Sequence, residues 1–282
     1  MGATLLRLGR LSLYLALTLP LMPVQAAAVA LNRPLARRLP RFYHGWSARI
    51  LGFHIKAEGE RSSLRPTLFV SNHTSYLDIE ILGALIEGSF VAKREVARWP
   101  FFGWLAKLQR TVFVDRRVRS TAAQRDAIRE RLDAGDNLIL FPEGTANDGN
   151  RVLPFKSALF SVADYSGRSG ALTVQPVSLA YTRLDGIPLG RFYRPFFAWY
   201  GDMELAPHLW AMLGLGTVEV AVTFHPPVTL AQFGSRKALA EHCHRVIAHG
   251  VAGALAGRNE EAPLPAVEGP QTALAKEAVG AE

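Results

Sequence analysis

Hydrophobic positions along the chain follow two alternating patterns, short runs rich in β-branched residues and stretches with a helical period. The short runs predict strands at 67–71, 90–92, 111–114, 138–141, 173–181 and 217–224. The helical periods predict helices at 76–88, 121–134 and 235–249. Strands that alternate with helices in this way are typical of an α/β domain.

Two of these predicted elements carry local signals. Thr121 and Gln124 are spaced as a capping box at the start of the second helix, and Gly135 is placed to end it. Pro176 lies inside the run at 173–181 and has no N–H to donate to a neighbouring strand. We therefore expect this run to be an edge strand, to contain a bulge or to end near the proline.

The N-terminal region has a different pattern, because residues 11–32 contain no charged side chain. As a straight helix they would be about 33 Å long at ~1.5 Å per residue, enough for a hydrocarbon core of about 30 Å. Pro20 and Pro23 are expected to kink or break such a helix near its middle. A bilayer span and a bent hairpin in one leaflet therefore both fit the sequence.

The charge of the chain is concentrated at the same end. The net charge is +8, and residues 1–68 account for all of it, with ten basic and two acidic side chains. Such an excess predicts an anionic partner, either a membrane or a nucleic acid. Phe42, Tyr43 and Trp46 lie among these arginines, a mixture that suits lipid headgroups. No recognisable nucleic-acid-binding motif accompanies the charge, so we expect membrane lipids as partners and no nucleic acid.

The apolar stretch also resembles a signal peptide, with VQAAA as its cleavage site. However, more arginines follow the stretch than precede it, and the positive-inside rule then disfavours export of the domain that follows. We expect a membrane anchor with a basic amphipathic segment at 1–44 and a main domain at 45–255. Residues 256–282 lack large aromatics and a sustained apolar period, so we expect a disordered tail there.

The stretch SNHTSYLDIE places His73 and Asp78 where a predicted strand passes into a helix. Ser75 and Asp78 also have the spacing of a capping box, in which the two side chains only satisfy helix N–H groups. Within one helix, His73 and Asp78 would be about 140° apart. If His73 instead lies in the loop and Asp78 in the first helical turn, the carboxylate can reach the imidazole, fix its tautomer and raise its basicity.

The chain offers no obvious protein nucleophile to accompany this pair. No GxSxG motif occurs, and the lone Cys243 lies in a helical pattern far from Asp78. A His–Asp pair alone fits direct attack by a substrate hydroxyl with the histidine as general base. Backbone N–H groups near the histidine loop are candidate oxyanion donors. No metal site is expected, because His242 and His244 diverge on a helix.

Two further motifs follow predicted strands. FPEGT places Glu143 and Thr145 at the rim where ligands bind in α/β sheets, although the same residues would also make an ordinary turn. VFVDRR ends in Arg116 and Arg117, which could bind an acidic group or pair with Asp115 and solvent.

Together, NHTSYLD, VFVDR, FPEGT and VQPVSLAY resemble, in this order, the four sequence blocks of the glycerolipid acyltransferase family. That family includes the bacterial 1-acyl-glycerol-3-phosphate acyltransferases. The resemblance covers roughly residues 45–230. It implies a mixed β-sheet flanked by helices, preceded by an N-terminal helical pair embedded in one leaflet.

The resemblance also implies roles for single residues. His73 would be the general base and Asp78 its orienting partner. Pro176 would lie near the acyl-chain or donor site. Four residues would contribute to binding of the acyl acceptor: Arg116, Glu143, Gly144 and Thr145.

One position departs from the family pattern. Members that use phosphorylated acceptors commonly carry an arginine directly after FPEGT, where this chain has Ala146. Loss of a bidentate phosphate ligand is not a neutral change. Arg151 or Lys156 could replace it, with Lys93 as a further possible headgroup contact, or the acceptor lacks a phosphomonoester. This form of the block looks more like that of the lyso-ornithine lipid acyltransferases, whose acceptor is a monoacylated aminolipid.

We therefore expect a membrane-bound O-acyltransferase at the inner membrane, with residues 45–255 as its acyltransferase domain facing the cytoplasm. It would move a fatty acyl group from acyl-carrier protein or acyl-CoA, as co-substrate, to the free hydroxyl of a monoacylated lipid. The acceptor that we favour is lyso-ornithine lipid, with 1-acyl-glycerol-3-phosphate as the other choice. No further cofactor is expected. The alternative is a non-catalytic membrane lipid-binding protein with the same fold.

Overall fold

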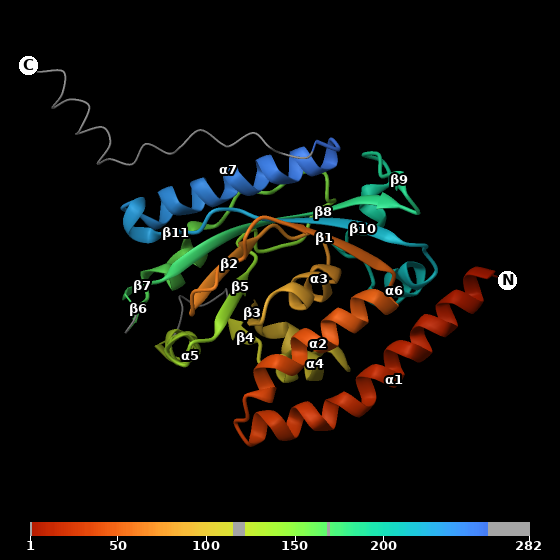
Figure 1. Cartoon of the computed structure of the whole chain (residues 1–282), viewed down its shortest axis with the longest axis horizontal. Coiled ribbons are helices and arrows are strands. Elements are labelled where there is room, and N and C mark those ends of the chain that lie inside the picture. The colour runs from red at the N-terminus through yellow and green to blue at the C-terminus, as the bar shows by residue number, and fades with distance from the viewer. Residues whose placement is uncertain (1, 115–121, 168–169, 259–282) are drawn as a thin grey trace, which may run out of the picture.

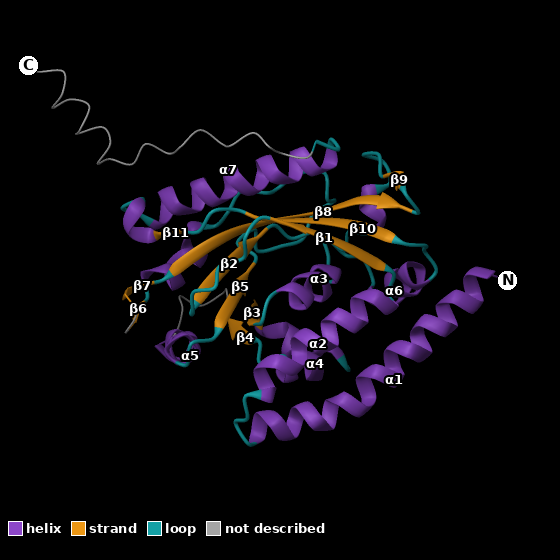
Figure 2. Ribbon diagram, viewed as in Figure 1, coloured by secondary structure: helices purple, strands orange, loops and turns teal. Residues whose placement is uncertain are grey.

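The computed structural model of the chain describes residues 2–114, 122–167 and 170–258, and its centre is a twisted β-sheet with helices on both faces (Figures 1 and 2). The strands of the main sheet are β1 (Phe53–Glu58), β2 (Thr67–Ser71), β3 (Gly88–Lys93), β4 (Val112–Val114), β5 (Asn137–Leu140), β8 (Thr173–Leu184) and β10 (Val218–Phe224). Their order is β1-β10-β8-β2-β5-β3-β4. Short strands β9 (Ile187–Pro188) and β11 (Val228–Thr229) pair with β8. A separate two-stranded sheet consists of β6 (Ser166–Gly167) and β7 (Gly170–Ala171).

The main sheet is mixed, as expected. β10 and β8 are antiparallel, whereas β2 runs parallel to both β5 and β8. Because β2, β5 and β8 share one direction, their carboxyl ends meet at one edge of the sheet. Segments that leave these ends are therefore close together in space, which is the usual position of ligand sites in α/β sheets.

The helices form a layer on each face of the sheet (Figure 1). One layer contains α1 (Gly2–Ala30), α2 (Leu35–Ile50), α3 (Leu77–Leu85), α4 (Phe102–Leu108) and α6 (Leu205–Leu213), and the other contains α5 (Ala122–Asp133) and α7 (Arg236–Leu255). Short 3₁₀ turns lie at Arg94–Arg98, Ser157–Asp164, Arg194–Phe196 and Leu230–Gln232.

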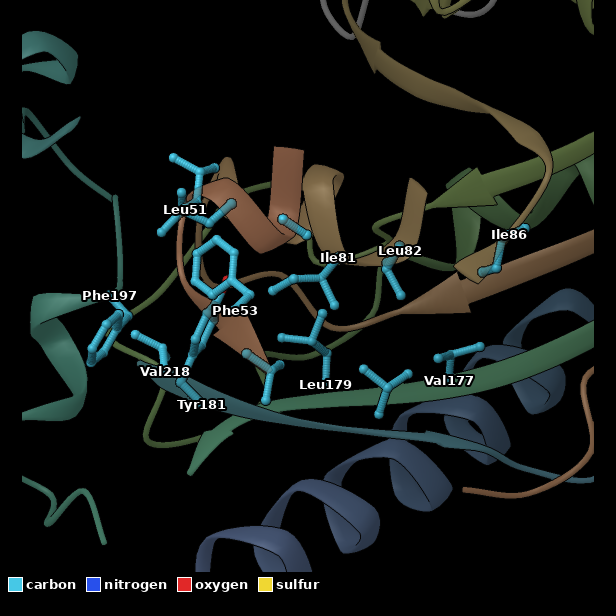
Figure 3. Packing of buried hydrophobic residues seen from close by; sticks show 14 of the residues in the cluster. Leu51, Phe53, Ile81, Leu82, Ile86, Val177, Leu179, Tyr181, Phe197 and Val218 are labelled. Atoms are coloured by element: carbon cyan, nitrogen blue, oxygen red, sulfur yellow. The ribbon is translucent and has the colours of Figure 1, made fainter. Parts of the chain in front are cut away.

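Alternation along the strands divides the core into two hydrophobic clusters. In β2, Phe69 packs on the α3 side, whereas Leu68 and Val70 pack on the α7 side. Figure 3 shows the first cluster, in which Leu51, directly after α2, and Ile81 of α3 meet residues of β8 and β10.

Most predicted elements are confirmed with adjusted ends. The predicted helix at 76–88 ends at Leu85, because Ile86 is extended and leads into β3. The predicted helix at 235–249 continues to Leu255, and the strand at 173–181 continues to Leu184. Thr121 of the expected capping box lies outside the described residues, as does most of the tail expected to be disordered.

The expectation of an edge strand at Pro176 is wrong, because β8 lies between β10 and β2. On one side Pro176 pairs with Val70. On the other side β10 stops pairing at Val177 and β11 begins at Val174, and between them the His225 N–H donates to the Pro176 carbonyl at 3.0 Å. The missing N–H therefore falls where the neighbouring strand is interrupted, so no ladder bond is lost.

The expected break at Pro20 and Pro23 is also wrong, because α1 is a single helix through both prolines. Contacts on either side of them hold it in place. The Thr18 hydroxyl is hydrogen-bonded to Tyr43 of α2 at 3.1 Å, and Gln25 Nε2 donates to backbone carbonyls of Ala36 and Leu108. The chain reverses at 31–34 instead, where Asn32 has a φ of +47°, and α2 begins at Leu35. The expected boundary between residues 44 and 45 falls inside α2.

Among the described residues, one helix, α1, is long and apolar enough to cross a membrane, and it lies at the N-terminus. Its apolar side chains are largely exposed, because its main contacts, with α2, α4 and α6, cover only part of its surface.

Candidate active site

The loop between β2 and α3, residues 72–76, lies at the carboxyl edge of the sheet and carries His73. Neighbouring Asn72 fixes this loop to β8. Its side-chain amide donates to the Leu179 carbonyl and accepts from the Leu179 N–H, both at 2.9 Å. The loop therefore has a fixed position relative to the central strand.

His73 and Asp78 are brought together by this loop. His73 Nδ1 lies 2.9 Å from Asp78 Oδ2, and Asp78 is fully buried in the first turn of α3. The imidazole stacks on the Phe141 ring, with 4.2 Å between centroids. About a fifth of the His73 side chain is exposed. Among the described residues, no hydrogen bond involves His73 Nε2, so this nitrogen is available to a substrate.

Asp78 accepts further hydrogen bonds that suit an ionised carboxylate. Oδ2 also accepts from the backbone N–H groups of Thr74 at 2.7 Å and Ser75 at 3.0 Å. Oδ1 accepts from the Tyr181 hydroxyl at 2.8 Å. Four donors on one buried carboxylate offset much of the cost of burying its charge.

The structure combines the capping contact and the His–Asp contact in this stretch. Asp78 caps the N–H groups before α3, as a capping box requires, and also orients His73. The reciprocal bond is absent, because the Asp78 N–H donates to the Ser75 carbonyl at 3.1 Å. Ser75 Oγ is buried without a hydrogen-bond partner in the described part of the chain.

Glu143 braces the histidine loop from the neighbouring strand end. Oε1 accepts from the His73 N–H at 2.8 Å, while Oε2 accepts from Asn147 Nδ2 at 2.7 Å and from the Leu153 N–H at 2.9 Å. The side chain is buried, and this desolvation raises the pKa of Glu143 to about 7 despite the three donors. Both carboxylate oxygens thus bond to protein groups and hold the two loops together, and the expected contact of Glu143 with an acceptor stays a prediction.

Three of the candidate oxyanion donors near the histidine loop are already engaged by side chains of the protein. The N–H groups of His73, Thr74 and Ser75 donate to Glu143 or Asp78, so they are not free to bind a developing oxyanion.

The other expected acceptor residues lie around this centre in different settings. Gly144 is buried and has φ +76°, a left-handed conformation that favours glycine at this turn. Thr145 is exposed, and its hydroxyl donates to the Ala146 carbonyl at 3.3 Å. Arg116 lies outside the described residues. The remaining three, exposed in neighbouring segments, are Lys93, Arg151 and Lys156.

Three residues of the site were not singled out from the sequence: Phe141, Asn147 and Tyr181. Asn147 joins both loops, because its Nδ2 donates to Glu143 and, at 3.3 Å, to the His73 carbonyl. Tyr181 could have been found from strand alternation, since it lies two and four residues after Leu179 and Val177 and so faces α3 with them.

An apolar cavity of about 160 Å³ lies beside the site. Its walls come from α1, α2, α3, β3 and α4, and include Tyr14, Met22 and Trp99. Phe90 lines the cavity and stacks on Phe141, the ring that also stacks on His73. The cavity can hold part of an apolar chain close to the imidazole.

Comparison with known proteins identifies the class of protein that this fold and site define. The acyltransferase family matches residues 54–180. The crystal structure of the 1-acyl-sn-glycerophosphate acyltransferase of Thermotoga maritima is similar with a TM-score of 0.58 at 25% identity, over 79% of this chain and 81% of that one. The lyso-ornithine lipid O-acyltransferase of Brucella abortus is 47% identical, over 86% of this chain and 92% of that protein. This chain therefore belongs to the acyltransferase family.

Two further relatives indicate which kind of acyltransferase this chain is. The lyso-ornithine lipid O-acyltransferase of Rhizobium meliloti is 39% identical over 90% of both chains. The 1-acyl-sn-glycerol-3-phosphate acyltransferase of Neisseria meningitidis is 34% identical over 61% of this chain and 64% of that protein. The protein is thus an enzyme, a membrane-associated lysolipid acyltransferase of lipid biosynthesis.

Proposed function

We propose that the protein is a lyso-ornithine lipid O-acyltransferase, which transfers a fatty acyl group from acyl-carrier protein or acyl-CoA to the free hydroxyl of lyso-ornithine lipid. The observation that carries the chemistry is the hydrogen bond between His73 and buried Asp78 beside an apolar cavity. The choice of acceptor is supported by Ala146, which replaces the arginine of phosphate-using family members, and by relatives of that name at up to 47% identity.

In the proposed reaction, His73 Nε2 accepts the proton of the acceptor hydroxyl as the oxygen attacks the thioester carbonyl. The tetrahedral intermediate then collapses, the carbon–sulfur bond breaks, and the thiolate takes the proton back from His73. Asp78 stabilises the imidazolium formed in between, because a negative charge lies against Nδ1. The products are the diacylated lipid and the free thiol of the donor.

Glu143 and Asn147 act as positioning residues in this proposal. They connect the FPEGT loop, which is proposed to bind the acyl acceptor, to the His73 backbone. The FPEGT loop and the histidine therefore keep a fixed relative position. Arg116, Lys93, Arg151 and Lys156 are proposed headgroup contacts, together with the turn at Gly144 and Thr145. The cavity beside His73 would hold an acyl chain.

We further propose that the catalytic domain faces the cytoplasm at the inner membrane. Carrier-protein and CoA thioesters are water-soluble, whereas the lysolipid and its product stay in the bilayer. A domain held at the inner surface by α1 reaches both. The excess of arginines after α1 supports this orientation.

The test is an assay of the purified protein with labelled acyl-carrier protein and acyl-CoA, against lyso-ornithine lipid and lysophosphatidate in mixed micelles. We expect transfer mainly to lyso-ornithine lipid and its loss in His73→Ala. His54→Ala is the matched control, because His54 is exposed on β1. Equal or better turnover of lysophosphatidate would refute the acceptor, and full activity of His73→Ala would refute the mechanism.

A further inference from the structure

The segment of residues 187–200, here called the aromatic rim, exposes large apolar side chains beside the active site. Phe192 is 81% exposed, Tyr193 57% and Phe196 54%, and their rings contact one another. A contiguous exposed cluster of this kind on a soluble protein usually marks an interaction surface.

The inner residues of the aromatic rim are firmly joined to the catalytic site. The backbone N–H of Trp199 donates to the Thr74 carbonyl in the histidine loop at 3.0 Å. Buried Phe197 stacks on Tyr181, whose hydroxyl holds Asp78. Arg194 donates to Asn150 Oδ1 at 3.1 Å, in the loop after FPEGT. The exposed aromatics are therefore held rigidly next to the site.

The aromatic rim continues into the surface of α1. It leads into α6, and α6 packs against α1. Arg10 of α1 donates to the Gly216 carbonyl at 3.1 Å after α6, and the Arg7 guanidinium lies over the Trp210 ring at 5.6 Å. Figure 1 places β9, α6 and the N-terminal end of α1 on one side of the molecule. Exposed leucines of α1, among them Leu5 and Leu13, extend the apolar surface.

We propose that the aromatic rim is a second membrane-contacting element, which inserts Phe192, Tyr193 and Phe196 into the lipid headgroup region beside the active site. Its composition fits this partner, because it contains arginines and aromatics and no acidic residue between Asp185 and Asp202. With α1 it would place both sides of the site at the bilayer, where the lysolipid lies. This goes beyond the proposed function and depends only on the lipid nature of the acceptor.

An acidic carrier protein fits the same surface less well. Such a partner needs accessible cations, and of the two arginines in the aromatic rim Arg194 is already bonded to Asn150 and to the carbonyls of Leu189 and Leu255. Arg191 is exposed, but it is one cation among the exposed apolar side chains of the segment, which are Ile187, Phe192, Tyr193, Phe196 and Tyr200.

The test attaches an environment-sensitive NBD fluorophore to Phe192→Cys in the full-length protein. The native Cys243 does not compete for the label, because it is fully buried and burial raises the pKa of its thiol to about 12. Leu13→Cys on α1 reports membrane binding as such, and Glu241→Cys on the exposed face of α7 is the control. Each protein is reconstituted with phosphatidylglycerol–phosphatidylethanolamine vesicles, with or without lipids that carry doxyl quenchers.

We expect the labels at positions 192 and 13 to shift to the blue and to be quenched by doxyl lipids, and the label at 241 to do neither. A label at 192 that behaves like the one at 241, while the one at 13 responds, would overturn the proposal. So would a response at 192 to added carrier protein alone. Transfer activity that depends on His73 would persist in either case, so failure here is distinct from failure of the proposed function.

A kinetic measurement supplies a second readout. Phe192→Ser combined with Phe196→Ser is expected to raise the apparent KM for vesicle-borne acceptor at least roughly tenfold, since two aromatic side chains lose burial at the interface. The kcat should stay within about twofold. Leu64→Ser is the matched control, because Leu64 is 60% exposed and precedes β2 at the opposite end from His73. An unchanged KM in the double variant would contradict the inserted position.

Discussion

Replacement of Asp78 by asparagine removes the negative charge beside His73 while it preserves the shape of the side chain. In the wild-type protein one carboxylate oxygen accepts from His73 Nδ1 and two backbone N–H groups, and the other accepts from Tyr181. An asparagine can present its oxygen to only one of these sets. The imidazolium that forms during transfer then lacks its counter-charge.

The magnitude follows from the geometry. The contact atoms are 2.9 Å apart. The two charge centres are then separated by ~4 Å, and at an effective dielectric constant of about 20 their attraction is about 4 kcal/mol. Loss of this stabilisation in the transition state slows transfer by about 10³-fold. The change should appear in kcat more than in KM, because the charge on His73 develops only during the reaction.

The assay is the initial rate of labelled acyl transfer to lysolipid in mixed micelles across pH 5 to 9. Asp164→Asn is the matched control, because Asp164 is half-exposed and pairs with Arg236 on the surface. Circular dichroism and melting temperature check that the variant is folded. If folded Asp78→Asn retained more than about a tenth of the wild-type kcat, the counter-charge argument would be refuted.

Three further predictions concern residues around this centre. Tyr181→Phe should lower kcat about tenfold, because the Tyr181 hydroxyl holds Asp78 in place against His73 and one hydrogen bond to a buried carboxylate is worth about 1.5 kcal/mol. Exposed Tyr193→Phe should leave kcat unchanged, and an unchanged kcat in Tyr181→Phe would show that this hydrogen bond does not position the pair. The pKa of Glu143, raised to about 7 in the folded protein against 4.5 for the free side chain, means that its contribution to stability is full below about pH 4.5 and is lost as pH rises through 7. The wild-type melting temperature should therefore fall more between pH 5 and 8 than that of Glu143→Gln, and equal falls would show that another group titrates. Ala146→Arg should raise kcat/KM for lysophosphatidate relative to lyso-ornithine lipid about tenfold, the effect of one charge-assisted bond; a constant ratio would place the headgroup elsewhere.

The strands were predictable from sequence because each face of a strand is either buried or partly covered along its whole length. β2 and β5 are buried on both faces, so they appear as continuous apolar runs, and β10 alternates because one face is only partly covered. The edge-strand prediction at Pro176 was wrong because it considered only the missing N–H of proline. The free-energy cost of that missing N–H depends on whether a partner strand faces it, which the sequence does not reveal. The predicted break at Pro20 and Pro23 was wrong for a related reason, since packing of α1 on α2 and α4 outweighs the local disruption of the helix by proline.

In the active site too, contacts between residues close in sequence could be predicted, whereas contacts between distant residues could not. The contact of His73 with Asp78 spans five residues and one loop, so spacing was sufficient to anticipate it. Tyr181 reaches Asp78 across 103 positions, and Glu143 reaches the His73 N–H across 70. Such contacts depend on the strand order, which spacing along the sequence does not give. Glu143 was expected to contact the acceptor, but its burial places it where it holds the His73 loop.

The place of α1 in the molecule has a consequence for how this enzyme can be altered. Tyr14, Thr18 and Met22 of α1 form one wall of the cavity proposed to hold the acyl chain, while other faces of the same helix are exposed. In the proposed function, attachment to the membrane and selection of the acyl chain thus depend on one helix. An unrelated hydrophobic helix in its place would then keep the protein on the bilayer but leave the cavity open. Mutations that adapt the enzyme to a bilayer of different thickness would also change which acyl chains it prefers, and the two properties would evolve together.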